Sequence, residues 1–389
     1  MIDIQDPSQC SGCTACAAVC AHDAIAMRPD ALGFMYPVVD SQKCVDCGLC
    51  DKVCAFNDGY DRSLNLSQPT AYGARHNDMA EVATSRSGAV FIAISDYVLA
   101  NGGVVYGAGY ADHFRVIHKR ATTKAQRDEF KGSKYVQSDM TGVFRQVRDD
   151  LRAGFTVLFS GTPCQTIGLH SYVGRKLRDN LILVDIVCHS VPSPYIWRDY
   201  LTYLEEKRGA EIVHVDFREK GQSGWRAHKE AFKYVASEDS LEIRQNYTYL
   251  FYKHIMFRHS CGVCKYTNLQ RPSDITLADF WGWQKTDAAI NADDKGLSLV
   301  LCNTEKGQLL FDTVKGCMTV IPVKLENCMQ PNLQHPSDIH PQRMDFERDY
   351  ARKGFVYVMK KYGNLGCRHQ VKVFVTRLKR IVKRILGRR

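Results

Sequence analysis

The chain has 389 residues, of which 45% are hydrophobic and 24% charged. This is the composition of a globular protein, and it excludes a fibrous or wholly disordered chain. The length predicts roughly two to three domains. The net charge is +10, but nine Lys or Arg and no acid lie between Arg368 and Arg389, so the rest of the chain is nearly neutral. A basic face for nucleic acid is therefore not expected.

The start of the sequence is acidic and lacks the apolar stretch of a secretory signal. No segment reaches the roughly 18 unbroken apolar residues of a membrane span. We therefore expect a cytoplasmic protein whose sixteen cysteines are reduced thiols.

Eight of these cysteines form a tandem repeat within the first 54 residues, with the spacing Cys-x2-Cys-x2-Cys-x3-Cys in each half. In bacterial ferredoxins, three close thiolates of such a run hold one cluster and the fourth binds the other cluster. Structural zinc sites or free thiols are the alternative, but two identical runs favour clusters. The spacing predicts two [4Fe-4S] clusters, one on Cys10, Cys13, Cys16 and Cys54 and one on Cys44, Cys47, Cys50 and Cys20.

The segment 58–70 is polar, contains Gly and Pro, and is typical of a linker. From residue 71 onward, β-rich runs alternate with helical patterns, which predicts βα units and a mainly parallel sheet. The stretch 211–242 alternates like antiparallel strands, so the second half is expected to be mixed. The predicted strands cover 104–108, 116–119, 156–160, 181–186, 212–217, 275–278 and 298–302, and the predicted helices 89–99, 141–152 and 195–207.

Four further cysteines in the body form a second group. Cys164 and Cys188 each follow the C-terminal end of a predicted strand, where parallel sheets gather ligand-binding groups, and Cys261 and Cys264 have the spacing Cys-x2-Cys. Four thiolates suffice for a third [4Fe-4S] cluster or for a tetrahedral zinc. Lone buried cysteines are common, so the spacing alone does not decide between a third metal site and four free thiols. No ligand spacing is found at Cys302, Cys317, Cys328 and Cys367.

Six motifs follow one another in the order found in a known family. They are Ser87-Gly88-Ala89, GSKYVQS at 132–138, FSGTPCQ at 159–165, CHSVPSP at 188–194, CGVCKY at 261–266 and DITLADFWG at 274–282. From Cys10 to about Gly307 the chain resembles the coenzyme F420 hydrogenase/dehydrogenase beta-subunit family in its form with a fused ferredoxin domain. Ala89 and Ser190 stand where the family has glycine, so each adds a small side chain near an expected contact.

The resemblance implies a flavoenzyme in which iron–sulfur clusters exchange single electrons with FAD, and FAD exchanges a hydride with a deazaflavin of coenzyme F420 type or another organic substrate. A surface-polysaccharide precursor is one such substrate, because the family occurs beside such functions. The resemblance also implies the third cluster on Cys164, Cys188, Cys261 and Cys264. It places flavin contacts at Ser87, Gly88, Gly161, Thr162 and Gln165.

The loop 132–138 supports a flavin site from its own chemistry. It offers a positive charge, hydroxyls and backbone N–H groups suited to a pyrophosphate, at Ser133, Lys134, Tyr135, Gln137 and Ser138. An ordinary polar loop is the alternative. No Gly-x-Gly-x-x-Gly motif follows a strand, so a Rossmann site is not supported and NAD(P)H is not expected as the direct donor.

His189 is the candidate catalytic residue, because an imidazole beside a reduced flavin can donate a proton near neutral pH. A structural histidine is the alternative. Downstream, Phe280 and Trp281 are candidates for an apolar wall of the pocket, or for the core. Residues 370–389 form a basic amphipathic pattern that suits peripheral contact with the inner face of a membrane; a helix docked on the body or a disordered end is the alternative.

The predicted fold class is thus α+β to α/β, with a ferredoxin-type dicluster domain fused to a mixed α/β flavin-binding body. We expect domains at 1–60, 71–150 and 151–325, with a C-terminal extension at 326–389. The predicted function is an iron–sulfur flavoprotein oxidoreductase. An electron-transfer subunit that feeds a partner protein, without a substrate of its own, is the alternative, and a cluster-based redox sensor is a third reading.

Overall fold

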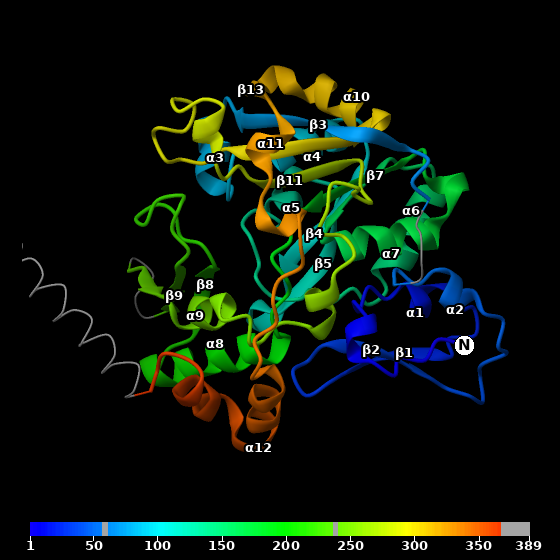
Figure 1. Cartoon of the computed structure of the whole chain (residues 1–389), viewed down its shortest axis with the longest axis vertical. Helices are drawn as coiled ribbons and strands as arrows, with labels where there is room; N and C mark the ends of the chain where they lie inside the picture. The colour runs from blue at the N-terminus through cyan, green and yellow to red at the C-terminus, as the bar shows by residue number, and fades with distance from the viewer. Residues whose placement is uncertain (57–60, 236–239, 367–389) are drawn as a thin grey trace, which may run out of the picture.

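The computed structural model describes residues 1–56, 61–235 and 240–366 (Figure 1). The predicted amphipathic segment 370–389 and Cys367 lie outside the described residues. Within the described part, no helix combines the length and apolarity needed to cross a membrane.

Residues 1–56 form a small domain at the lower right of the view, below helices α6 and α7 (Figure 1). Its strands β1 (Ile25–Pro29) and β2 (Met35–Val39) pair antiparallel. Its helices α1 (Ala15–Val19) and α2 (Leu49–Lys52) begin after residues with positive φ, Thr14 and Gly48, which turn the cysteine loops sharply into the helices.

The body is built on one mixed sheet. In the described part of the chain it has eight strands in the order β13-β3-β12-β11-β7-β6-β4-β5. The central strands β4, β6, β7 and β11 are parallel, and the flanking strands are antiparallel, so the prediction of a mainly parallel sheet holds only for the centre. The strands are β3 (Asn65–His76), β4 (Val104–Tyr110), β5 (Val116–Ala121), β6 (Val157–Gly161), β7 (Leu181–Ile186), β11 (Ile275–Asp279), β12 (Ser298–Thr304) and β13 (Met318–Val323).

Strand β3 corrects the prediction of a linker over 58–70, because it already begins at Asn65. It pairs with β12, where Asn65 lies opposite Thr304, and with β13, which the sequence did not predict. Because residues 65–70 are polar, the sequence did not indicate this strand, whose partner strands are more than 200 residues away in the chain.

Helices cover both faces of the sheet because side chains along each strand alternate. Tyr106 faces the apolar side chains of α6 and α7, whereas its neighbour Val105 faces those of α4 and α10. The helices packed around the sheet are α3 (Met79–Thr84), α4 (Val90–Ala100), α5 (Lys124–Asp128), α6 (Val143–Arg152), α7 (Pro163–Val173), α10 (Glu305–Val314) and α11 (Leu325–Cys328).

A second apolar core lies beside the sheet (Figure 1). It contains a three-stranded antiparallel sheet, which confirms the prediction for 211–242. Its elements are β8 (Ile212–Asp216), β9 (Glu230–Tyr234), β10 (Glu242–Arg244), α8 (Pro194–Arg208), α9 (Asn246–Tyr252) and α12 (Arg343–Lys361). Short 3-10 helices connect the body, among them η2 (Asp112–Phe114), η3 (Arg175–Leu177), η5 (His259–Val263), η6 (Trp283–Lys285), η7 (Lys315–Cys317) and η8 (Pro331–Leu333), while η1 (Pro7–Gln9) precedes the first cysteine.

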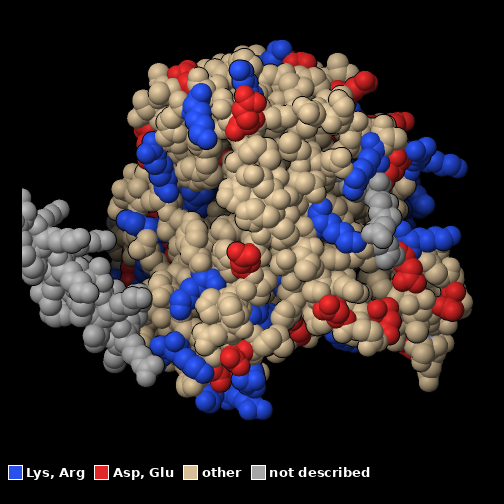
Figure 2. Space-filling view, viewed as in Figure 1, with Lys and Arg blue, Asp and Glu red and all other residues tan. Residues whose placement is uncertain are grey.

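The predicted fold class, a ferredoxin-type domain joined to a mixed α/β body, is confirmed. On the face shown in Figure 2, Lys and Arg are interspersed with Asp and Glu rather than gathered together. This mixture agrees with the nearly neutral charge counted for the chain before residue 368.

Candidate iron–sulfur sites and cofactor cavity

Two small cavities, each of about 20 Å³, lie in the N-terminal domain. One, here named the Cys10 cavity, is lined by Cys10, Cys13, Cys16 and Cys54. The other, the Cys44 cavity, is lined by Cys20, Cys44, Cys47 and Cys50. The fold therefore gathers the same two sets of four cysteines that the spacing predicts, each with one member from the other run.

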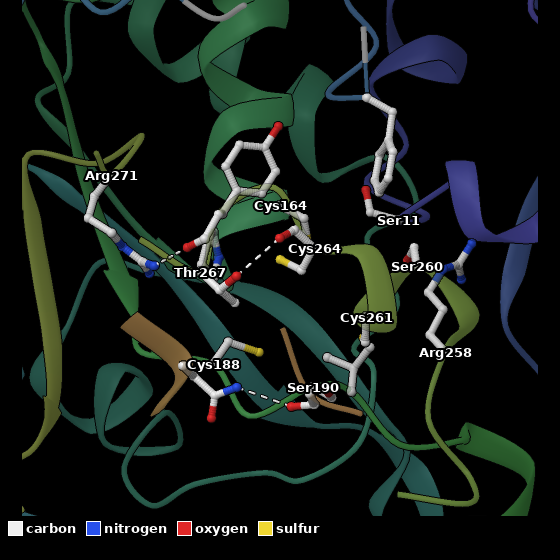
Figure 3. A pocket seen from close by; sticks show the side chains of 16 residues that line it. Ser11, Cys164, Cys188, Ser190, Arg258, Ser260, Cys261, Cys264, Thr267 and Arg271 are labelled. Atoms are coloured by element: carbon white, nitrogen blue, oxygen red, sulfur yellow. Dashed lines mark hydrogen bonds between the residues drawn. The ribbon is translucent and has the colours of Figure 1, made fainter. Parts of the chain in front are cut away.

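A third cavity, of about 40 Å³, lies in the body and is named the Cys164 cavity. Its four cysteines converge from three segments that are far apart in the chain (Figure 3). Cys164 is in the first turn of α7, Cys188 follows β7, Cys261 lies in η5 and Cys264 comes directly after it.

The four cysteines of the Cys164 cavity are half-buried. Burial raises the pKa of Cys261 to about 11 and that of Cys264 to about 12, and it raises the pKa of Cys188 well above the usual range. Neighbouring cysteines add to each increase, because thiolates close together repel one another. Four mutually repelling thiolates need a positively charged group between them, so this donor set fits an iron–sulfur cubane.

A single zinc ion fits less well. Among the described His, Cys, Asp and Glu residues, no group of three or more is arranged to hold one metal ion. A cubane binds each thiolate to a separate iron and therefore suits a wider ring of sulfurs than one tetrahedral ion does.

Neighbouring cavities share some of their lining residues. Ser11 and Phe56 line both the Cys10 cavity and the Cys164 cavity. Cys188, Ser190 and Val191 line both the Cys164 cavity and a fourth, large cavity. The Cys164 cavity thus lies between the ferredoxin domain and the large cavity.

The large cavity has a volume of about 600 Å³, which is in the range of cofactor sites. It opens at the carboxyl ends of β6 and β7, where α/β sheets bind ligands. The predicted residues that line it are Ser87, Ser133, Lys134, Tyr135, Ser138, Gly161, Thr162, Gln165 and His189.

Two of the expected flavin contacts lie elsewhere. Gly88 is packed against β3, where a Cβ atom would lie only 2.1 Å from the carbonyl oxygen of Ala74. Gln137 faces the ferredoxin domain, where its Nε2 donates to the carbonyl oxygen of Ser11 at 2.8 Å. Neither residue lines the large cavity.

A polar network forms one wall of the large cavity. The Nε2 of Gln165 donates to Ser138 Oγ at 2.9 Å, and its Oε1 accepts the backbone N–H of Thr162 at the start of α7. Ser138 Oγ also lies 2.8 Å from His118 Nδ1. Burial lowers the pKa of His118 to about 4, so this ring is neutral at pH 7 and holds Ser138 without adding charge.

Lys134 is a cation that lines the same cavity. Its Nζ donates to the carbonyl oxygen of Lys131 at 3.0 Å and lies 5.0 Å from the ring centre of Tyr110. No carboxylate of the described residues forms an ion pair with it, and burial lowers its pKa to about 7. A half-buried ammonium without an ion-pair partner is suited to a phosphate.

The sequence did not single out Arg218, which also lines the cavity. It pairs with Asp279 and lies 5.6 Å from the ring centre of Trp281, which in turn stacks on Trp225. Trp281 lines the cavity as expected, whereas Phe280 is buried in the core. A single Arg in a β-rich stretch belongs to no sequence motif, so its place in the cavity could not be predicted from the sequence.

His189 lies at the boundary with the Cys164 cavity, and its Nε2 is 3.0 Å from the Nε2 of His254. Burial and the neighbouring His254 lower the pKa of His189 to about 4. The ring is therefore neutral at pH 7, and not near its titration point as the sequence suggested. One of the two imidazoles must donate its N–H to the other.

Two family models match the chain. Residues 155–324 match the C terminus of the coenzyme F420 hydrogenase/dehydrogenase beta subunit, and residues 9–57 match the 4Fe-4S dicluster domain. No curated protein matches. Among solved structures, a chain of the F420-reducing [NiFe] hydrogenase complex from Methanosarcina barkeri is 17% identical, with a TM-score of 0.46 over 76% of this chain and 92% of that chain. The two family matches cover the predicted cysteine repeat and most of the predicted motifs, so the chain combines an N-terminal iron–sulfur dicluster domain with the C-terminal domain of the coenzyme F420 hydrogenase/dehydrogenase beta subunit.

Proposed function

We propose that the protein is an iron–sulfur flavoenzyme that passes electrons between [4Fe-4S] clusters and FAD and exchanges a hydride with a deazaflavin of coenzyme F420 type or an organic substrate, such as a surface-polysaccharide precursor. The observation that carries this proposal is the succession of shared walls from the Cys10 cavity through the Cys164 cavity to the large cavity. FAD supplies the conversion between single electrons and a hydride.

The residues of the large cavity suit this cofactor. Lys134 and Ser133 offer a cation and a hydroxyl to the pyrophosphate, and the neutral network of Gln165 and Ser138 offers hydrogen bonds to a polar ring edge. Cys188 and Ser190 belong to two cavities at once, so a ring seated beside them borders the third cysteine set directly.

An electron-transfer subunit without its own substrate is the second candidate. It is favoured by the family description, which names a beta subunit and hence a protein that works beside other chains. Turnover of a deazaflavin or an organic substrate by the isolated chain supports the enzyme, whereas a chain that reacts only with a redox protein supports the subunit.

The first experiment is to purify the protein without oxygen and to measure iron, acid-labile sulfide and flavin per chain. We expect about 12 irons and one FAD, because three cubanes carry four irons each. About 8 irons without flavin would contradict both the third cluster and the flavin site, and would leave only the dicluster domain.

Lys134 makes the binding of FAD depend on pH. The half-buried ammonium has a pKa of about 7 in the free site, so above that pH it must take up a proton before it can hold a phosphate. We expect FAD affinity to fall as the pH rises above 7, by up to about tenfold per pH unit. Replacement of Lys134 by Met should weaken binding at pH 6 by roughly 10- to 100-fold and remove the pH dependence.

The measurement is FAD binding by fluorescence between pH 6 and 9. Lys131→Met is the matched control, because Lys131 also lines the cavity but is already paired with Glu81 at 2.7 Å. The control should keep the pH dependence of the wild type. A Lys134→Met variant with an unchanged pH profile would exclude this role.

A further inference from the structure

The side chain of Arg258 is fully buried where the ferredoxin domain meets the body. Its Nε donates to the carbonyl oxygen of Cys10 at 2.7 Å, and its two Nη atoms donate to the carbonyl oxygen of Met35 and to Oε1 of Gln137, both at 3.0 Å. One guanidinium thereby joins the first cysteine loop, strand β2 and the loop 132–138.

Arg258 also lies against two of the predicted cluster sites. It lines the Cys164 cavity (Figure 3). On its other side it contacts Gly12, which lines the Cys10 cavity and where a Cβ atom would lie 2.9 Å from an Nη atom of Arg258. The ring centre of Tyr36 is 4.2 Å from the guanidinium carbon. The positive charge is therefore held between the two cavities, away from water.

None of the three acceptors of Arg258 carries a charge, and no carboxylate of the described residues forms an ion pair with it. Arg271, which lines the same cavity, is different, because Asp185 lies 3.1 Å from it. A buried cation without a counter-charge is costly. A cysteine-ligated cubane, whose four thiolates give it a net negative charge, would supply that counter-charge on either side of Arg258.

We propose that Arg258 raises the reduction potentials of the clusters in the Cys10 and Cys164 cavities, and so favours the entry of electrons into both. Reduction of a cubane adds one electron, without a proton and without a change in bonds. The added negative charge is stabilised by a fixed cation in a medium of low dielectric constant. The effect at the Cys164 cavity rests on the proposed third cluster, whereas the effect at the Cys10 cavity requires only the dicluster domain.

The test is a redox titration of the anaerobic full-length protein, followed by the EPR signals of the reduced clusters. In Arg258→Met we expect the midpoint potentials of these two clusters to shift to lower values, and in Arg258→Lys we expect a smaller shift, because the charge is kept. Unchanged potentials in Arg258→Met with the iron content of the wild type overturn the proposal.

Arg145→Gln is the matched control. Arg145 crosses the same domain boundary and donates to the carbonyl oxygens of Ala18 and Cys20, at 3.0 and 2.9 Å. It is, however, 39% exposed and paired with Asp23, so its charge is compensated and screened by water. Replacement of this arginine should leave the two midpoint potentials unchanged. A shift equal to that of Arg258→Met would mean that a loosened boundary, and not the buried charge, sets them.

Gln137→Glu is a second variant that keeps Arg258. It places a carboxylate beside Nη1 and should lower the same potentials by neutralising the guanidinium; unchanged potentials with full iron content overturn the proposal even if Arg258→Met does not fold. The iron count separates the two ideas. About 8 irons in the wild type would refute the third cluster alone, and Arg258 would then be judged on the signal of the cluster in the Cys10 cavity.

Discussion

Replacing both Cys261 and Cys264 by Ala is expected to lower the iron content from about 12 to about 8 per chain. It is also expected to abolish the reduction of bound flavin by a reduced ferredoxin, a donor too large to enter the large cavity. The physical reason is the position of the Cys164 cavity, which shares walls with the Cys10 cavity on one side and with the large cavity on the other. Iron analysis and stopped-flow absorbance are the measurements.

Cys317→Ala is the control for this double variant, because Cys317 is an exposed thiol that lines none of the cysteine cavities. It should keep the iron content and the rate of flavin reduction. If the double variant retained about 12 irons, or reduced its flavin at the wild-type rate, the Cys164 cavity would not hold a cluster between the two domains.

The second large effect is expected for Arg271→Met, which should lower the free energy of unfolding by about 3–5 kcal/mol. Arg271 and Asp185 are both almost fully buried, with Nη2 of Arg271 3.1 Å from the carboxylate. The same Nη2 donates to the carbonyl oxygen of Ile186 at 2.8 Å. The variant would leave the carboxylate of Asp185 buried without its cation, beside a carbonyl that has lost its donor.

Urea unfolding of the anaerobic protein, followed by tryptophan fluorescence, measures this loss. The double variant Arg271→Met with Asp185→Asn removes both charges and should be clearly more stable than Arg271→Met alone. A double variant no more stable than the single one would show that the packing of Arg271, and not its charge, stabilises this region.

The iron–sulfur sites were the most predictable part of the molecule. The eight N-terminal cysteines lie within 54 residues, and their spacing alone is sufficient to define two sets of ligands. Cys164 and Cys188 were placed by a topological argument, since the carboxyl ends of adjacent parallel strands meet at one edge of a sheet. Both the spacing of cysteines and the order of strands can be read directly from the sequence.

Other features depend on contacts between distant segments and could not be predicted. Strand β3 was missed because the polar residues from Asn65 to Thr70 gain their partners only from β12. Gln137 was assigned to the flavin, but its amide bonds to Ser11, which belongs to another domain. Arg258 belongs to no motif, and its contact with the first cysteine loop exists only in the folded chain.

The contact between Gly168 and Cys13 determines how closely the ferredoxin domain can approach α7. Gly168 lies in α7, one turn after Cys164, and a Cβ atom there would lie 2.8 Å from the sulfur of Cys13. One rigid helix thus sets the separation of the two cysteine sets, independently of the peptide connection between the domains. Any residue larger than glycine at position 168 would therefore collide with Cys13 and increase the distance between the Cys10 cavity and the Cys164 cavity.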